Sequence, residues 1–489
     1  MDTQDQRASA RRNWPRTYPE PVKISQYLFK STTWVIGLRL GNALLAIVIS
    51  AILARLLDPE NLGYYFLIFA VVTISSNLVR TGQGAAAIRL IAEAEALGKL
   101  GRARQVALLT LFGVSAIAVL FAFLYYAFFG QWLFSEFFNA PAVLGLTGLT
   151  AAWIIIVGVR TQIAFIFRGM HAVRLAALFN GFVSTFATLV LLVFLYYRQA
   201  APQLGDILVV SIAGASVGLL VALVFLRSAL RNFRGEGSVR VSEVSTIAWP
   251  LFLIAITNMV MTQGDMVLVG NLFDEKALAF YGVTLRLKRI VVLELLVLGT
   301  VISPVIARLY AQKEIVRLEK VLRLVSTLAL IPLTLVTLIL FLFGDTIFAW
   351  IFGEVYRGAY PILTILLAGL YVSALMGSGQ QLMVMTGHER ELLPIKVIGG
   401  LSAIIIGMLT APHLGVIGIA AGFSVATAGI STVTTLRAKK LTGISCYVHS
   451  PSYFLKRENR LEITQELARL IRQSMAGKFG KGRKSAHEE

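Results

Sequence analysis

Long apolar stretches dominate the chain, and short polar segments separate them. Twelve of these stretches hold about 20 or more mostly apolar residues, which is the length that a helix needs to cross the hydrocarbon core of a bilayer. The pattern therefore predicts an all-α polytopic membrane protein with twelve transmembrane helices. The predicted spans are 31–57, 62–82, 105–129, 142–167, 173–197, 205–226, 246–272, 278–304, 321–343, 361–386, 391–411 and 415–436.

Basic residues are divided unevenly between the polar segments. The N-terminus, every second connection and the C-terminal tail carry 35 of the 45 Lys and Arg residues. The connections between them carry only Arg198, Lys276 and Arg357. Because basic segments stay on the cytoplasmic side of a membrane, we expect both termini to be cytoplasmic. The first thirty residues contain no apolar stretch, so we expect no cleavable signal.

One turn occurs twice along the chain. "LLDPENLGYY" at 56–65 matches "LFDEKALAFY" at 272–281 with a constant shift of 216 positions. A looser match, with a shift of 218 positions between its glycines, relates "FRGMHAVRLAALFN" at 167–180 to "MTGHERELLPIKV" at 385–397. Each shift corresponds to six spans, an even number, so the two copies run parallel in the membrane. Parallel repeats of this kind form two bundles with the substrate path between them in some transporters.

We therefore predict two parallel six-helix bundles around a central cavity. The polar stretch 227–245 is the longest between spans, and we interpret it as the linker between the bundles. Apolar positions in the tail repeat at helical spacing among basic residues, which predicts either a helix on anionic lipid or a solvated basic tail. The predicted parts are a cytoplasmic N-terminal segment 1–30, an N-terminal bundle 31–226, a cytoplasmic linker 227–245, a C-terminal bundle 246–436 and a basic cytoplasmic tail 437–489.

Composition agrees with a membrane protein and excludes several other classes. The chain is 57% apolar and 15% charged, against roughly 25% charged residues in soluble proteins. Its net charge of +19 follows membrane orientation, so we expect no nucleic-acid partner. A single cysteine, Cys446, forms neither an internal disulfide nor a metal cluster. No phosphate-binding loop, nucleophile elbow or HExxH motif occurs, so we expect no enzyme, cofactor or metal site on this chain.

Four arginines lie deep within the predicted spans. A charged side chain at the bilayer centre costs about 2.5–3.5 kcal/mol on insertion scales, so it usually faces a wet cavity or a partner. A guanidinium suits phosphate because its planar fork bonds bidentately. We predict that these arginines bind an anionic substrate such as a diphosphate; the alternative is that they pair structurally with acids or carbonyls. The four are Arg39, Arg160, Arg286 and Arg289.

Only two acidic residues lie clearly within the spans, namely Asp265 and Glu294. Either acid is a structural partner or a coupling site, and Asp265 is the first candidate partner for Arg286. Because acids are so few, we expect the cavity to be cationic. Arg55 and Arg80 lie near span ends, where we expect their side chains to extend to the membrane interface. Lys288 should point away from Arg286, toward a different wall.

Four phrases together resemble the polysaccharide transporter family. They are "LARLLDPENLGYYFLIFAVVTISSNLVRTGQGAAAIRLIAEA" at 53–94, "GDMVLVGNLFDEKALAFYGVTLRL" at 264–287, "MVMTGHERELLPIKV" at 383–397 and "LGVIGIAAGFSVATAG" at 414–429. Their order and spacing match the family along most of the chain. The second copy of the repeated turn departs from it, because Ala279 stands where a glycine is expected.

This resemblance implies a fold and a function. The family shares a superfamily with multidrug and toxic compound extrusion antiporters and with lipid II flippases. It implies two six-helix bundles and the flipping of undecaprenyl-diphosphate-linked oligosaccharide across the bacterial cytoplasmic (inner) membrane by alternating access, for O-antigen or exopolysaccharide synthesis. The implied partners are the lipid-linked oligosaccharide, membrane lipid, a glycan polymerase and a chain-length regulator.

Two other functions remain open at this stage. An ion-coupled antiporter of drugs or metabolites has a similar fold, but we expect it to need acids for cationic substrates. A non-transporting scaffold for glycan assembly is the third possibility. The sequence does not reveal the glycan, the energy source or the oligomeric state.

Overall fold

The computed structural model describes residues 21–198, 202–233, 235 and 237–448. Within these ranges the side chains of 21–33, 254, 293–301 and 304 are not described, so the predicted site residue Glu294 lies outside the described side chains. Most of the predicted N-terminal segment and the proposed lipid-binding part of the tail also lie outside. Val35–His449 forms one compact unit, and the description below applies to it.

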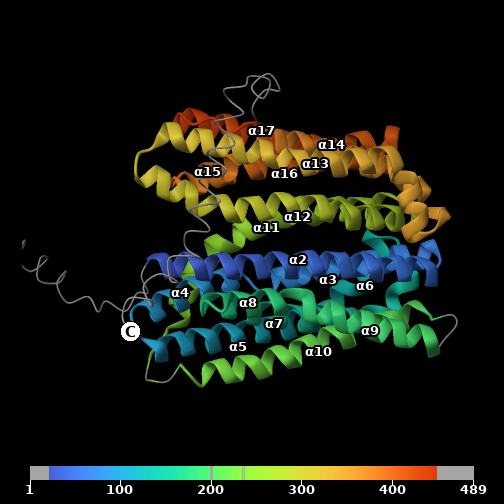
Figure 1. Ribbon diagram of the computed structural model, residues 1–489. Helices are drawn as coiled ribbons and strands as arrows, with labels where there is room; N and C mark the ends of the chain where they lie inside the picture. The colour runs from blue at the N-terminus through green and yellow to red at the C-terminus, as the bar shows by residue number, and fades with distance from the viewer. Residues whose placement is uncertain (1–20, 199–201, 234, 236, 449–489) are drawn as a thin grey trace, which may run out of the picture. The chain divides into compact units, whose positions relative to one another are not determined.

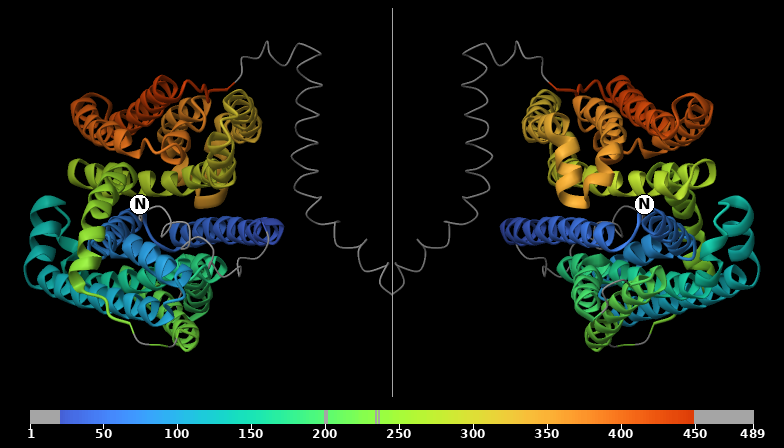
Figure 2. Two further views of the ribbon diagram at one scale, coloured as in Figure 1. Left: turned by 90° about the vertical axis from the view of Figure 1, so that its left-hand side faces the viewer. Right: turned by 90° about the vertical axis from the view of Figure 1, so that its right-hand side faces the viewer.

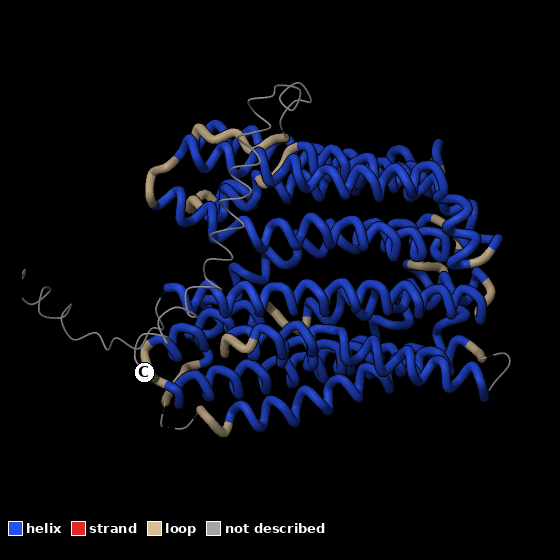
Figure 3. The backbone as a smooth tube through the Cα atoms, viewed as in Figure 1, coloured by secondary structure: helices blue, strands red, loops and turns tan. Residues whose placement is uncertain are grey.

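The described residues form helices and loops without any strand (Figure 3). In Figure 1 the long helices run side by side in two stacks, one from each half of the chain. The first half comprises α2 (Pro21–Leu56), α3 (Pro59–Leu78), α4 (Gln83–Ala96), α5 (Leu100–Leu124), η1 (Tyr125–Phe129), α6 (Gly130–Trp132), η2 (Leu133–Phe137), η3 (Pro141–Leu146), α7 (Thr147–Gly169), α8 (Val173–Ala177), η4 (Leu178–Phe182), α9 (Val183–Arg198) and α10 (Leu204–Leu230). The second half comprises α11 (Val241–Leu272), α12 (Glu275–Ala311), α13 (Ile315–Phe352), η5 (Glu354–Ala359), α14 (Tyr360–Leu375), α15 (Gly379–Met385), η6 (Glu389–Glu391), α16 (Leu392–Leu414) and α17 (Val416–Thr442).

The two-bundle plan is confirmed. Eleven helical segments in the described part of the chain are long and apolar enough to cross a membrane. The one predicted span not among these eleven, 278–304, falls in α12, whose 37 residues run alongside the other helices. This helix carries three basic residues, Arg286, Lys288 and Arg289, within about one turn. Seen from the end where α4 and α15 lie, the two bundles are stacked, and α2 and α3 of the first half face α11 and α12 of the second (left view of Figure 2).

One predicted span is broken in the structure. The stretch 361–386 was expected to be continuous, but α14 ends at Leu375 and α15 begins only at Gly379. Gly377 lies in the left-handed region with φ +71°, and a Cβ there would lie 2.0 Å from the backbone carbonyl oxygen of Cys446. The chain after α17 therefore passes so close to Gly377 that only glycine fits. An apolar pattern does not reveal such a break, because both pieces are equally apolar.

The repeated turn caps a helix in both halves. The Asp58 side chain accepts a hydrogen bond from the backbone N–H of Asn61 at 2.8 Å, and Asp274 accepts one from Ala277 at 2.9 Å. Aspartate at this position satisfies a free backbone donor in the first turn of the helix. The two acidic turns are therefore the N-caps of α3 and α12. We call the membrane end where they lie the turn side, and the opposite end, where α4 and α15 lie, the basic side.

The bundles meet at the turn side through α3 and α12. A Cβ on Gly63 would lie 1.9 Å from the backbone oxygen of Glu275, and one on Gly282 would lie 2.1 Å from the Phe66 ring. The shift of 216 relates Phe66 to Gly282 and Gly63 to Ala279. The two copies of the repeat thus cross each other closely, with a large side chain of one copy over a glycine of the other.

Polar contacts add to this closure of the turn side. The Tyr64 hydroxyl donates to the Glu275 carboxylate at 2.7 Å. Asn271 donates to the carbonyl of Phe137 at 2.5 Å. Arg55 donates to the carbonyl of Trp350 in the other bundle at 2.7 Å. Each of these bonds joins the two bundles, so opening the turn side requires that they break.

Candidate cationic cavity

A cavity lies between and within the bundles, from the middle of the helices toward the basic side. It has two lobes, of about 490 and 460 Å³, which share Phe69, Arg286 and Arg289. The first lobe, here the N-lobe, is otherwise lined by α2, α3, α7, η4, α9 and α10. The second, here the C-lobe, is lined by α11, α12, α14, α15, α16 and α17, together with Phe66 and Ala70 of α3.

Arg286 and Arg289 lie where the two lobes meet. They are three positions apart on α12, so they project from the same face of the helix. Arg286 is only 8% exposed, and its guanidinium lies 4.6 Å from the centre of the Phe69 ring and 5.3 Å from that of Phe66. Arg289 is exposed toward the cavity. Within the described residues neither arginine forms an ion pair, so aromatic faces rather than acids stabilise the Arg286 cation.

The N-lobe is lined by further arginines and by no acid among its described lining residues. Arg160 is 8% exposed and donates from Nη1 to the carbonyl of Phe179 at 2.9 Å. The guanidinium groups of Arg80 and Arg168 lie 5.1 and 5.3 Å from the centre of the Phe165 ring. The expectation that Arg80 extends to the membrane interface is wrong, because its guanidinium lines the cavity and donates to the carbonyl of Ser76 at 3.1 Å.

Several buried polar atoms that line the N-lobe have no hydrogen-bond partner in the described structure. They are Oδ1 of Asn42, Nε of Arg160 and Oγ of Ser184. Buried polar groups are nearly always hydrogen-bonded, so such atoms are satisfied by water or by a ligand. Donors and acceptors that are free in this way are suited to an anion that carries hydroxyl groups.

The C-lobe has a different chemical character. It holds two lysines, Lys288 and Lys396, and the Lys396 ammonium donates to Oδ1 of Asn258 at 3.1 Å. Lys288 lines this lobe and not the N-lobe, together with Arg286 and Arg289. The remaining polar lining consists of amides and hydroxyls, with one acid. These residues are Asn258, Thr262, Gln263, Asp265, Gln380, Thr427 and Ser431.

Asp265 is held by hydrogen bonds rather than by an arginine. It is 1% exposed, accepts from the Tyr281 hydroxyl at 3.2 Å and accepts from the backbone N–H of Met266 at 2.9 Å. In the described residues it forms no ion pair with Arg286, its first candidate partner. Whether Asp265 also takes part in coupling stays a prediction.

Arg39 does not join the other predicted site residues. It is half-buried on α2 and lines neither lobe, although Asn42, one helical turn further on, lines the N-lobe. Its depth in the span made it a candidate, but depth does not fix the direction in which a side chain points. Arg160, Arg286 and Arg289 are brought together on one cavity, and Arg80, Arg168, Lys288 and Lys396 are cations that complete its lining.

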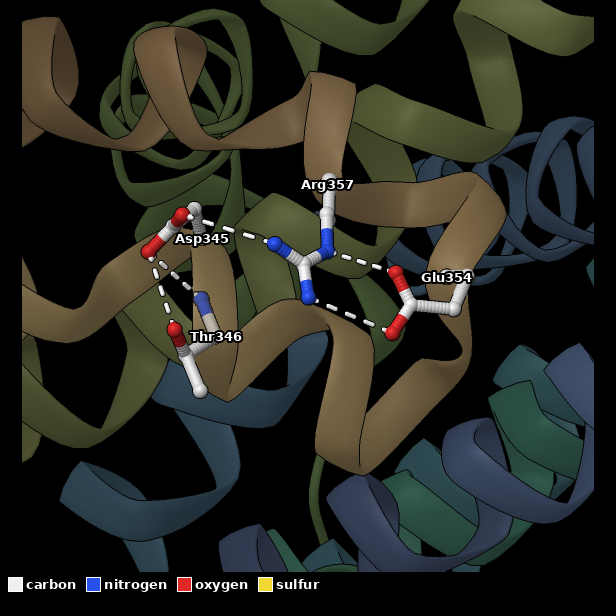
Figure 4. A network of polar contacts seen from close by, with 4 residues as sticks. All are labelled: Asp345, Thr346, Glu354 and Arg357. Atoms are coloured by element: carbon white, nitrogen blue, oxygen red, sulfur yellow. Dashed lines mark hydrogen bonds and ion pairs between the residues drawn. The ribbon is translucent and has the colours of Figure 1, made fainter.

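An arginine on the turn side shows what a neutralised cation looks like in this protein. Arg357 donates from Nε to Glu354 at 2.6 Å and lies 3.8 Å from Asp345, so two acids surround it (Figure 4). The cavity cations have no such partners, since the described lining of the two lobes holds seven cations and one acid. Excess positive charge in an enclosed space attracts and holds an anion. The seven cations are Arg80, Arg160, Arg168, Arg286, Lys288, Arg289 and Lys396.

Two family models match the chain. The family model described as polysaccharide biosynthesis protein matches residues 28–310, which is more than half of the chain. The chain belongs to this family. A second model, MatE, matches residues 250–409 in the C-terminal half. The family resemblance seen in the sequence is therefore confirmed.

Solved structures share the fold at low sequence identity. An inward-facing multidrug resistance MATE family transporter of the MOP superfamily superposes with a TM-score of 0.66 at 16% identity, covering 82% of this chain and 94% of the other. A MATE transporter of Vibrio cholerae gives 0.61 at 17%, covering 86% and 97%. A MOP superfamily transporter of Pyrococcus furiosus gives 0.58 at 14%, covering 87% and 99%. No curated protein shows significant sequence similarity to the chain.

Proposed function

We propose that this protein flips a polyprenyl-diphosphate-linked oligosaccharide, such as an undecaprenyl-linked one, from the cytoplasmic to the outer leaflet of a bacterial inner membrane. The observation that carries the proposal is the cavity, whose described lining holds seven cations and one acid, in a member of the polysaccharide biosynthesis family. A diphosphate is an anion that guanidinium groups bind bidentately. A neutral or cationic substrate would gain nothing from such a lining.

The arrangement suggests how the substrate is held. The diphosphate binds at Arg286 and Arg289, where both lobes meet, and Arg160 adds a third guanidinium from α7. The sugars occupy the lobes, while the polyprenyl chain stays in the bilayer at a gap between the bundles. Because the positive-inside rule assigns the basic side to the cytoplasm, the substrate enters from the side toward which the lobes extend.

Release requires the bundles to rock apart at the turn side. The contacts that must break are the Tyr64–Glu275 and Arg55–Trp350 hydrogen bonds and the close crossing of α3 and α12 at Gly63. No phosphate-binding loop occurs in the chain, so the membrane potential or an ion gradient supplies the energy. Asp265 is the acid in the described cavity lining at which an ion or proton would couple.

The test replaces the cavity arginines one at a time. Arg160→Ala, Arg286→Ala and Arg289→Ala are introduced into a flippase-deficient strain, and surface polysaccharide is measured at equal expression. Each variant should lower the yield by about tenfold or more, because a charge-assisted bond contributes about 1.5–3 kcal/mol. Arg308→Ala is the matched control, since Arg308 is an exposed arginine of α12 outside both lobes. Arg39→Ala should also have little effect. Yields at the wild-type level for all three cavity variants would overturn the proposal.

An ion-coupled antiporter of drugs or metabolites is the second candidate. The MatE match over residues 250–409 and the buried Asp265 favour it. The excess of cations in the cavity opposes it, because cationic drugs would be repelled. Inverted membrane vesicles distinguish the two: ion-driven accumulation of a cationic dye, unaffected by Arg286→Ala, would support the antiporter instead of the flippase.

A further inference from the structure

We propose that a small pocket in the C-terminal bundle, here the hydroxyl pocket, binds an uncharged sugar of the transported glycan next to the diphosphate. This inference rests on the proposed function and assigns a subsite within it. The pocket has a volume of about 160 Å³ and lies between α13, α14, α15 and α17. Its lining residues are Val325, Ser326, Ala329, Ser373, Ala374, Gly377, Ser378, Gln380, Gln381, Ile430, Ser431, Thr434 and Thr435.

The lining of the hydroxyl pocket is polar but carries no charged side chain in the described structure. Its polar groups are hydroxyls, which both donate and accept, and amides, which offer two donors and a carbonyl. A charged ligand would lose hydration there without gaining a counter-charge, and an apolar ligand would leave the hydroxyls without water. A neutral ligand with several hydroxyl groups satisfies both conditions, and a sugar is such a ligand.

Several of these groups are free to bind. Thr434 is 3% exposed, yet its hydroxyl makes no hydrogen bond in the described structure. The side chains of Ser378 and Gln381 likewise make none among the described residues. By contrast, Ser373 and Ser431 bond each other at 2.5 Å. The pocket therefore presents donors and acceptors that lack protein partners, as a ligand site does.

The fold keeps this pocket open by breaking a helix. α14 ends at Leu375 and α15 starts at Gly379, so the pocket lies beside a turn instead of a continuous helix. The segment after α17 fixes the break: the backbone N–H of Val448 donates to Leu375 at 3.0 Å, and Ser326 donates to the carbonyl of Cys446 at 3.2 Å. The break is thus part of the folded C-terminal bundle.

The hydroxyl pocket adjoins the C-lobe. Gln380, Ile430 and Ser431 line both. A substrate whose diphosphate lies on Arg286 and Arg289 would therefore extend its sugars through the amide- and hydroxyl-lined C-lobe into this pocket. This orients the substrate within the cavity.

The experiment compares diphosphate diesters of equal charge that differ by one sugar. The purified full chain in lipid nanodiscs is titrated with undecaprenyl methyl diphosphate, which is the sugarless lipid, and with undecaprenyl diphosphate esterified to glucose, galactose or N-acetylglucosamine. Wild-type protein should bind at least one sugar lipid about fivefold or more tightly than the sugarless lipid, since two hydrogen bonds contribute about 0.5–1.5 kcal/mol each. Thr434→Val and Gln381→Ala should reduce this ratio to about twofold or less and leave the sugarless affinity unchanged.

Two controls keep the result interpretable. Thr432→Val alters a hydroxyl on the same helix that bonds the carbonyl of Ala428 and lies outside the pocket, so the ratio should persist. Arg286→Gln should weaken all the lipids equally. If no sugar lipid binds more tightly than the sugarless lipid, or if the ratio survives both pocket variants, the subsite is overturned while the flippase proposal stands. If none of the lipids binds wild-type protein, both proposals are overturned.

Discussion

The two halves of the molecule share their turns but not their cavity chemistry. Asp58 and Asp274 cap α3 and α12 through the same hydrogen bond, 216 positions apart. Deeper in the same two helices the equivalence is lost, because the positions that match Arg286 and Arg289 are Ala70 and Thr73. A duplicated backbone has thus been kept where it closes the protein and altered where it meets the cavity.

The lobes differ in the same way. Both linings hold amides and hydroxyls, but the described lining of the N-lobe adds arginines and no acid, whereas that of the C-lobe also includes two lysines and Asp265. Arg286 and Arg289 belong by sequence to the second half but line both lobes. The two halves can therefore share a backbone arrangement without sharing a binding site. The crossing of α3 and α12 holds the bundles together, and a few residues that differ between the two copies set the charge of the cavity.

The largest expected effect comes from breaking the crossing of the two copies. In Gly63→Val the new Cβ would lie 1.9 Å from the backbone oxygen of Glu275, which cannot move without shifting α12. We expect transport to be abolished, measured as surface polysaccharide in a flippase-deficient strain. The matched change Ala279→Gly removes a buried methyl group from the other copy and should cost only about 1 kcal/mol of stability. Similar transport by both variants would show that the crossing is not closely packed.

A second change tests whether the two lobes need different cations. Arg160→Lys keeps the charge in the N-lobe, but an ammonium cannot both bond the carbonyl of Phe179 and present a planar fork to a phosphate. We expect transport to fall about tenfold, the loss of one bidentate interaction. The reverse exchange, Lys396→Arg in the C-lobe, should change transport by about twofold or less. A larger loss for Lys396→Arg would place the anion in the C-lobe instead.

The sequence predicted the helices and bundles more completely than it predicted the residues that line the cavity. Apolar length and the repeated turn predicted the bundles, because both signals lie along single helices. The depth of Arg160 and Arg286 was likewise readable from the sequence. The direction of a side chain is set by neighbouring helices, so the sequence did not show that Arg39 lines neither lobe or that Arg80 lines the N-lobe. The break at Gly377 was missed because its cause, the carbonyl of Cys446, lies far along the chain.

A double-mutant cycle distinguishes a structural from a purely coupling role for Asp265. Tyr281→Phe removes the hydroxyl that donates to this buried carboxylate, which should lower the free energy of unfolding by about 1–3 kcal/mol. In the Asp265→Asn background the same change should cost less, because no buried charge is left without its donor. Thermal unfolding in detergent measures both. The first half has no equivalent pair, since Ile49 stands at the position that matches Asp265. Additive effects would mean that the hydrogen bond between Tyr281 and Asp265 contributes nothing to stability.

The smallest expected effect concerns the reactivity of thiols at the ends of the two halves, near the end of α10 and after α17. In the last turn of α10, before the linker, Ser228 is exposed, whereas after α17 the chain turns back so that Cys446 is buried. Burial raises the pKa of the Cys446 thiol to about 11, so below that pH the thiol stays protonated and its alkylation, which needs the thiolate, is slow. N-Ethylmaleimide at neutral pH should therefore modify Cys446 at least tenfold more slowly than a Ser228→Cys thiol in a Cys446→Ser chain, as followed by intact mass.

The rate at Cys446 should rise with pH toward the raised pKa, and transport should be unchanged by Cys446→Ser, since the segment holds the α14–α15 break through backbone groups. Equal labelling of the two thiols would mean that the segment leaves Gly377 in solution. The break would then not be fixed by this contact, and the hydroxyl pocket would lose the feature that separates the C-terminal bundle from its N-terminal counterpart.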